Sequence, residues 1–220
     1  MDDLTPYYDE GGITIWHGDC RDILPRLNLK ADVVIVDPVW PNASQELAGS
    51  DDPYGLFADV ARLFPALTDR VVVHLGCDSD PRFLSGVPAS FPFFRVCYLE
   101  YACPHHKGRL LYTSDIAYVY GTPPPSRPGA RVIPGRSIAR LVSSRASRQH
   151  PCPRKLEHVR WLVNWFARGL VLDPFCGSGT TLEAAKACGL PAVGIEVSEA
   201  YCELAVQRLS QNVFDFEAAS

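Results

Sequence analysis

The chain has 220 residues and a mass of 24.3 kDa, enough for one domain with a substantial hydrophobic core. Its net charge of −4 and pI of about 5.8 do not, averaged over the chain, indicate a nucleic-acid partner. We find neither an export signal nor an apolar run of about 18 residues, so we expect a cytoplasmic protein without a membrane span. Eight scattered cysteines without a Cys-x-x-Cys pair favour reduced, buried thiols, and no metal site is expected.

Beyond an acidic leader that ends at Glu10, the sequence predicts strands alternating with helices. The predicted strands are residues 13–17, 31–36, 70–75, 91–101, 115–120, 171–173 and 192–197. The predicted helices are residues 21–27, 54–67, 156–166, 182–188 and 200–209. This pattern is typical of an α/β fold, here a single domain over residues 1–220 with a doubly wound, mostly parallel seven-stranded sheet and an antiparallel hairpin at its edge.

One stretch, residues 171–197, reads as a complete nucleotide-binding unit of strand, Gly-rich turn, helix, strand and acid. The first strand ends at Asp173, and a turn follows that contains Gly177-Ser178-Gly179. Glycines let the backbone approach a ligand closely, and the amides at the start of the helix point outward unpaired. Glu196, at the tip of the second strand, is placed to accept hydrogen bonds from ribose hydroxyls. We therefore predict a nucleoside-like ligand.

The stretch also carries the strongest family resemblance. Asp173-Pro174-Phe175-Cys176-Gly177-Ser178-Gly179-Thr180-Thr181 resembles the Asp-Pro-Phe-x-Gly-Ser-Gly-Thr-Thr motif of amino-group DNA methyltransferases. His150-Pro151-Cys152-Pro153-Arg154-Lys155-Leu156 resembles the segment that precedes this motif in the family, and Asp37-Pro38-Val39-Trp40 resembles its catalytic Asp-Pro-Pro-aromatic tetrapeptide. With the catalytic motif first and the cofactor motif last, the order is that of the family's beta group.

The resemblance implies a circularly rearranged methyltransferase sheet, in which the first strand lies beside the last. It also implies S-adenosylmethionine as the cofactor. The cofactor-binding residues would be Asp19, His150, Asp173, Phe175, Cys176, Gly177, Ser178, Gly179, Thr180 and Glu196. Asp19 also fits the N-cap of the helix that follows it, and the two roles are compatible.

The catalytic residues that the resemblance implies are Asp37, Pro38 and Trp40. The Asp37 carboxylate and the Pro38 carbonyl would accept the two hydrogens of an exocyclic amine and direct its lone pair at the methyl group. Trp40 would stack on a base flipped out of its duplex. Val39 departs from the second proline of the motif, which puts the rigidity of this loop in question.

Charge is distributed unevenly along the chain. Between Asp115 and Glu157 there is no acidic residue. Residues 121–150, rich in Pro, Gly, Ser and Arg, do not resemble packed core, and we interpret them as a basic arm that follows DNA phosphates. The predicted DNA-binding residues are Lys107, Arg109, Arg127, Arg131, Arg136, Arg140, Arg145 and Arg148. A solvated basic loop or a contact between protomers is the alternative interpretation of this segment.

We therefore predict a DNA methyltransferase acting at N6 of adenine, because relatives that modify N4 of cytosine more often carry Ser at the position of Asp37. N4 of cytosine is the nearest alternative. A catalytically silent nucleic-acid-binding subunit with the same fold, favoured by Val39, is an alternative of another class, and RNA is a third. The middle segment is short for a dedicated recognition domain, which favours a short target sequence, relaxed specificity or help from a second protomer in a homodimer.

Overall fold

The computed structural model describes residues 4–41, 47–124, 126, 129, 132–139 and 155–211, and it centres on one nine-stranded sheet. The strand order is β1-β2-β9-β8-β3-β4-β6-β5-β7. The strands are β1 (Tyr8–Glu10), β2 (Ile13–His17), β3 (Val33–Val36), β4 (Arg70–Leu75), β5 (Phe93–Lys107), β6 (Leu110–Gly121), β7 (Arg136–Ile138), β8 (Val171–Asp173) and β9 (Ala192–Glu196). None of the described helices combines the length and the apolarity needed to span a lipid bilayer.

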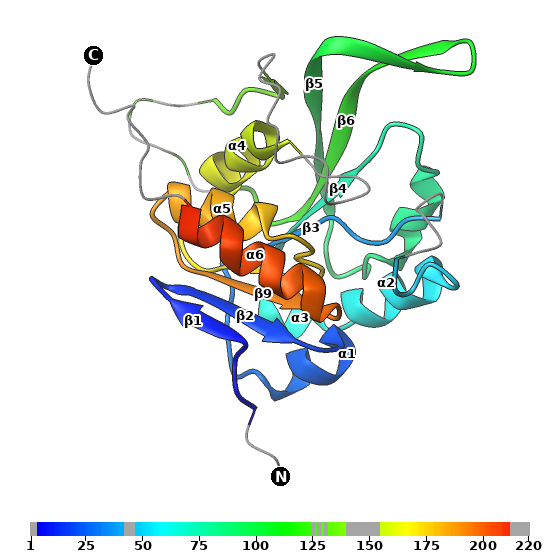
Figure 1. Cartoon of the computed structure of the whole chain (residues 1–220). Coiled ribbons are helices and arrows are strands. Elements are labelled where there is room, and N and C mark those ends of the chain that lie inside the picture. The colour runs from blue at the N-terminus through cyan, green and yellow to red at the C-terminus, as the bar shows by residue number, and fades with distance from the viewer. Residues whose placement is uncertain are drawn as a thin grey trace.

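Helices cover the two faces of the sheet, as Figure 1 shows. The helical segments are α1 (Cys20–Ile23), η1 (Leu24–Arg26), α2 (Pro53–Ala61), α3 (Phe64–Leu67), η2 (Pro81–Gly86), α4 (Leu156–Phe166), α5 (Thr180–Ala187) and α6 (Glu199–Gln211). One core cluster joins α4, α5 and α6 to one face of the sheet, and a second joins α1, η1, α2, α3 and η2 to the other. Because side chains alternate along a strand, neighbouring residues of β3 and β4 enter different clusters.

The first and last strands of the α/β unit lie side by side, as the family resemblance predicts. β2 pairs with β9 in parallel, with Ile13 opposite Ala192 and His17 opposite Glu196. β9, β8, β3 and β4 continue the parallel part of the sheet. β6 then runs antiparallel to both β4 and β5. The predicted doubly wound, circularly rearranged fold is confirmed.

Several predicted boundaries were wrong. The acidic leader, for which no strand was predicted, contains one, because Tyr8–Glu10 forms β1 against β2. The helix predicted over residues 54–67 is two helices, since the backbone turns between Ala61 and Phe64. The hairpin is longer than predicted and is not the sheet edge. That edge is β7, built from the Pro/Gly/Ser/Arg-rich segment. Ala139, just after β7, is fully buried, so the expectation of no packed core in this segment was wrong for Ala139.

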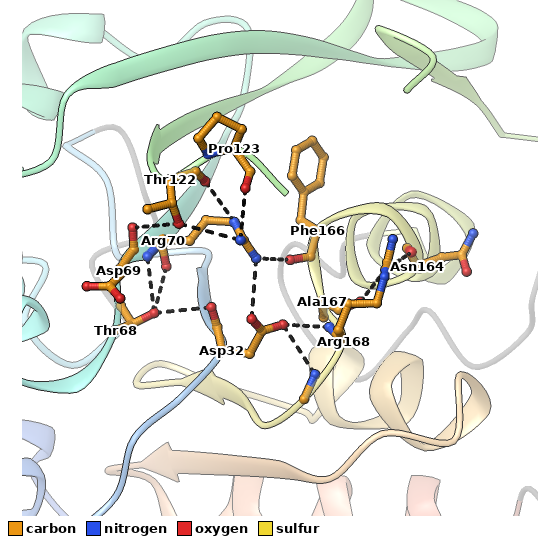
Figure 2. A network of polar contacts seen from close by, with 11 residues as sticks. Asp32, Thr68, Asp69, Arg70, Thr122, Pro123, Asn164, Phe166, Ala167 and Arg168 are labelled. Carbon is orange, nitrogen blue, oxygen red and sulfur yellow. Dashed lines mark hydrogen bonds and ion pairs between the residues drawn. The ribbon is translucent and has the colours of Figure 1, made fainter. Parts of the chain in front are cut away.

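A buried arginine connects several elements at the end of the sheet where the parallel strands begin, as Figure 2 shows. The Arg70 guanidinium donates to the carbonyl oxygens of Thr122 (2.9 Å), Phe166 (2.7 Å) and Pro123 (3.1 Å). It also lies 3.5 Å from a carboxylate oxygen of Asp32, just before β3. Burial lowers the pKa of Arg70, and the Asp32 carboxylate opposes that shift. One side chain thus links β4 to the entry of β3, the end of β6 and the end of α4.

Candidate functional site

A cavity of about 680 Å³ opens at the carboxyl ends of the parallel strands, where open α/β sheets bind ligands. It brings together residues from both ends of the chain. The predicted site residues that line it are Asp19, Asp37, Pro38, Trp40, Asp173, Phe175, Cys176, Gly177, Ser178, Thr180 and Glu196. The two motifs that the sequence placed far apart therefore share one site.

A row of ionisable side chains crosses the strand ends beside this cavity. In sheet order they are Glu196 on β9, Asp173 on β8, Asp37 just after β3, His74 on β4 and Asp115 on β6. By the alternation of each strand, all five point toward the face covered by α4, α5 and α6. Within the described residues, no group of three or more His, Cys, Asp or Glu side chains is arranged to hold a metal ion.

The carboxylate of Glu196 holds the glycine turn in place through hydrogen bonds. It accepts hydrogen bonds from the amides of Gly177 (2.9 Å) and Ser198 (2.8 Å). Burial raises the pKa of Glu196, and these amides oppose the shift. Gly177 has φ of 50°, a left-handed conformation that favours glycine. Each carboxylate oxygen keeps a lone pair beyond its amide contact, so Glu196 can still accept from a ligand hydroxyl.

Asp173 is a buried acid with a perturbed pKa. It is 2% exposed, and burial raises its pKa to about 7. The Thr181 hydroxyl and the Phe175 amide, which lies 3.1 Å from Oδ1, partly offset the effect of burial, while the charge of Asp37 adds to it. A cation bound in the cavity would stabilise the ionised forms of both Asp173 and Asp37.

Asp19 performs the capping role predicted for it. Its Oδ1 accepts from the amide of Arg21 at 2.8 Å, at the start of α1. Hydrogen bonds from the Arg21 side chain, opposed by partial burial, hold the pKa of Asp19 below its usual value. Since Asp19 also lines the cavity, the cap presents a charged carboxylate to any ligand there.

Arg208 on α6, which we did not predict, braces the glycine turn from outside the cavity. Its guanidinium donates to the hydroxyls of Thr180 (2.9 Å) and Ser178 (3.4 Å), and to the Glu183 carboxylate at 3.2 Å. The two hydroxyls assigned to the cofactor thus already have a protein partner. An arginine in a closing amphipathic helix gives no sequence signal of this role.

Gly179 does not line the cavity, although the sequence assigned it to the cofactor site. It has φ of 79°, and a Cβ there would lie 2.8 Å from the Cβ of Ala205 on α6. The residue is small because a helix packs against the turn. Gly194 on β9 is similar, since a Cβ there would meet the Cys176 sulfur at 2.8 Å. Burial raises the pKa of the Cys176 thiol well above its usual value.

Two buried groups in the row were missed by sequence reasoning. His74 is 2% exposed and lines the cavity, and its Nε2 lies 3.3 Å from Oδ2 of Asp115, which is 5% exposed. Nearby on α4, burial lowers the pKa of His158 to about 4, and its Nε2 contacts the Glu100 carbonyl at 3.0 Å. The available signal was a histidine near the end of a fully buried apolar strand.

The predicted DNA-binding residues divide by location. Arg109 is exposed at the tip of the β5–β6 hairpin, and Lys107 ends β5. Arg136 lies on β7, 3.6 Å from the Glu100 carboxylate. Arg127, Arg131, Arg140, Arg145 and Arg148 lie outside the described residues, as does His150, which was predicted to bind the cofactor.

Comparison with known proteins agrees with the geometry. Residues 130–207 match the family model N6_N4_Mtase, which is described as DNA methylase. Over 70 residues the chain is 39% identical to the orphan methyltransferase M.BamHII of Bacillus amyloliquefaciens, covering 30% of this chain and 25% of that protein. Residues 130–207 of the chain are thus similar to the N6/N4 DNA methylases. The match spans about a quarter of the length of that curated relative.

Solved structures, among them that of a DNA methyltransferase, share the fold. The M1.HpyAVI–SAM complex superposes with a TM-score of 0.71 at 23% identity, covering 90% of this chain and 98% of that one. PvuII DNA methyltransferase, which is cytosine-N4-specific, gives a TM-score of 0.73 at 15% identity, covering 96% of this chain and 90% of that one. At these identities the likeness is one of fold. The recognition of the family from sequence motifs is confirmed.

Proposed function

We propose that this protein transfers a methyl group from S-adenosylmethionine to an exocyclic amine of a DNA base, at N6 of adenine. The observation that supports this most is the shared cavity. It is lined by the glycine turn, by Glu196 at the end of β9, and by Asp37, Pro38 and Trp40 after β3. A cofactor site and a catalytic tetrapeptide that meet in one cavity are what transfer between two bound molecules requires.

The donor set of the cavity suits S-adenosylmethionine, which carries a positive sulfonium and ammonium group beside a ribose and an adenine. Asp19, Asp173 and Glu196 provide carboxylates, and Phe175 and Ile195 provide apolar surface. In this proposal Glu196 accepts from the ribose hydroxyls and Asp19 from the adenine amine. Asp173, whose pKa is raised to about 7 by burial, ionises more readily beside the bound cation. When bound, this cofactor supplies an electrophilic methyl group.

The residues after β3 act on the amine that receives the methyl group. An exocyclic base amine is a poor nucleophile because its lone pair is delocalised into the ring. The Asp37 carboxylate and the Pro38 carbonyl accept its two hydrogens, which pyramidalises the nitrogen and directs the lone pair at the methyl carbon. Trp40, partly buried on the cavity wall, stacks on the flipped base. Positioning and charge complementarity supply most of the rate.

The β5–β6 hairpin supports DNA as the substrate, because it extends past the strand ends at which the cavity opens. Leu75, the last residue of β4, pairs with Ile116, so the part of β6 before Ile116 extends past the carboxyl end of β4. Figure 1 shows this hairpin reaching beyond the body of the protein. Between Glu100 and Asp115 the hairpin has no acidic residue, and Arg109 is exposed near its tip.

The basic arm joins the same end of the sheet. β7 pairs with β5, with Arg136 opposite Tyr98, so Arg136 lies beside the base of the hairpin. We propose that Lys107, Arg109 and Arg136, with the arginines of residues 121–150, contact the phosphates of a duplex whose target base enters the cavity.

The decisive experiment is incubation of the purified protein with radiolabelled S-adenosylmethionine and duplex DNA, followed by digestion and nucleoside analysis. We expect label in N6-methyladenine. Label in N4-methylcytosine would keep the mechanism and overturn the choice of base. No label on DNA or RNA, with cofactor binding shown by calorimetry, would favour a catalytically silent subunit.

Asp37→Ala tests the assignment of the amine-binding residue. Cofactor binding should persist, while methyl transfer should fall by about 100-fold or more. Asp22→Ala, which removes an exposed acid from α1, is the matched control and should leave both unchanged. Turnover of Asp37→Ala at the wild-type rate would remove Asp37 from the mechanism.

The salt dependence of DNA binding tests the proposed surface. Replacing Lys107 and Arg109 by Ser, or Arg136, Arg140 and Arg145 together, should weaken binding. The slope of log K against log salt concentration is negative, and its magnitude should decrease by about 0.9 for every phosphate that the variant no longer neutralises. Arg26→Ser, in η1 and outside the hairpin and the arm, is the control. An unchanged slope would make these segments structural.

A further inference from the structure

The proposed reaction leaves one proton without an assigned acceptor. Methylation of an amine nitrogen that keeps both hydrogens gives a positively charged nitrogen, which must then lose a proton. Asp37 lies where the amine would bind, and the neighbouring strand β4 carries the imidazole of His74. Val36 pairs with Val73 across β3 and β4, so the next residues along, Asp37 and His74, are neighbours on strands about 4.8 Å apart.

Strand alternation places these two side chains on the same face of the sheet. Ile35 and Val72 are paired and belong to the core cluster under α4. Asp37 and His74 each follow two residues later, and so point to that face as well. Both line the cavity, together with Val159 of α4. The histidine is thus part of the site, although it is nearly fully buried.

Asp115 fixes the state of the imidazole ring. His74 pairs with Ala117 across β4 and β6, so Asp115, two residues from Ala117, points to the same face. Its Oδ2 lies 3.3 Å from Nε2 of His74. A carboxylate only accepts hydrogen bonds, so in this contact Nε2 carries the hydrogen and donates it. Nδ1 is then the ring nitrogen that carries the lone pair and can accept a proton.

We propose that His74, oriented by Asp115, accepts the proton released from the methylated amine, as a catalytic residue beyond the Asp37-Pro38-Trp40 set. The inference rests on the proposed function. The nitrogen lone pair forms the N–C bond, and the C–S bond breaks with its electron pair remaining on sulfur. The N–H bond then breaks, its electrons neutralise the nitrogen, and the proton moves to Nδ1. The resulting imidazolium returns the proton to solvent after the product leaves.

The charges around the ring favour this role. The imidazolium would lie between the carboxylates of Asp37, just after β3, and Asp115 on β6, two anions that stabilise it in a site shielded from water. On α4, His158 faces the same region, and burial lowers its pKa to about 4, so it is neutral at pH 7 and adds no competing positive charge. An arrangement of carboxylate, imidazole and reacting group is a recurrent one for proton transfer.

The test uses variants that separate the two ring nitrogens. His74→Gln keeps a donor toward Asp115 and offers no acceptor at the Nδ1 position. We expect kcat for DNA methylation to fall by about 100-fold or more. The Kd for DNA and for the demethylated cofactor product, measured by calorimetry, should not change. In His74→Ala, added imidazole should restore part of the lost turnover, which a purely structural role would not allow. Glu203→Gln, at an exposed position of α6, is the control.

Asp115→Asn adds a readout other than activity. Nitrogen-15 NMR of the wild type should show His74 with its hydrogen on Nε2, and this signal should change in Asp115→Asn. Wild-type turnover in His74→Gln, a loss confined to Kd, or failure of imidazole to restore His74→Ala would each overturn the inference. If the wild type itself transferred no methyl group, the proposed function would fail, and this inference with it.

Discussion

Replacing Arg70 by Met should destabilise the protein severely, because the guanidinium is buried and fully engaged. It donates to three carbonyl oxygens and pairs with Asp32 at 3.5 Å. Breaking a buried ion pair costs about 3–5 kcal/mol, chiefly because a charge is left without its partner. In the variant, the Asp32 carboxylate still accepts hydrogen bonds from the backbone amides of Arg168 (2.5 Å) and Gly169 (3.2 Å). Its negative charge therefore remains partly compensated. We therefore expect a loss near 3 kcal/mol.

Urea unfolding at pH 7, followed by circular dichroism, measures this loss as a change in the free energy of unfolding. Arg62→Met is the matched control, because Arg62 is exposed on the surface beside α2 and pairs with Asp59 in solvent. That control should show no resolvable change. In a double-mutant cycle, the combination of Asp32→Asn with Arg70→Met should cost less than the sum of the two single changes. A loss below about 1 kcal/mol for Arg70→Met would refute the reasoning.

Three further predictions concern the glycine turn and its acid. Gly179→Ala should destabilise more than Gly189→Ala in thermal unfolding, because both have positive φ but only the first brings a Cβ against Ala205. Asp173, whose pKa rises from 3.8 unfolded to about 7 folded, keeps its proton in the folded state, so the free energy of unfolding should fall as pH rises from about 4 to 7. Asp173→Asn should remove that fall, as urea titrations at pH 5 and 8 would show. Arg208→Met should weaken cofactor binding in calorimetry, with Arg208→Lys intermediate, whereas equal affinities would reduce Arg208 to a surface residue.

Much of the site was readable in the sequence because it depends on local order. Each parallel strand ends where its apolar run ends, so an acid directly after such a run must lie at the carboxyl edge of the sheet. Asp37, Asp173 and Glu196 were found in this way. The Gly177-Ser178-Gly179 turn was found because glycines between a strand and a helix indicate a backbone that a ligand can approach closely.

The rest depends on which strands become neighbours, and no local pattern encodes that. His74 looks like an ordinary residue of a buried strand until β4 pairs with β3 on one side and β6 on the other, which sets it between Asp37 and Asp115. Arg136 lies in a segment with the composition of a loop, and pairing with β5 makes it part of a strand. The sequence by itself determined the seven strands that carry the site and its neighbours, the turn, and the acids at the strand ends. The tertiary structure alone decided which charges meet, because the energy of a buried charge depends on neighbours that are distant along the chain.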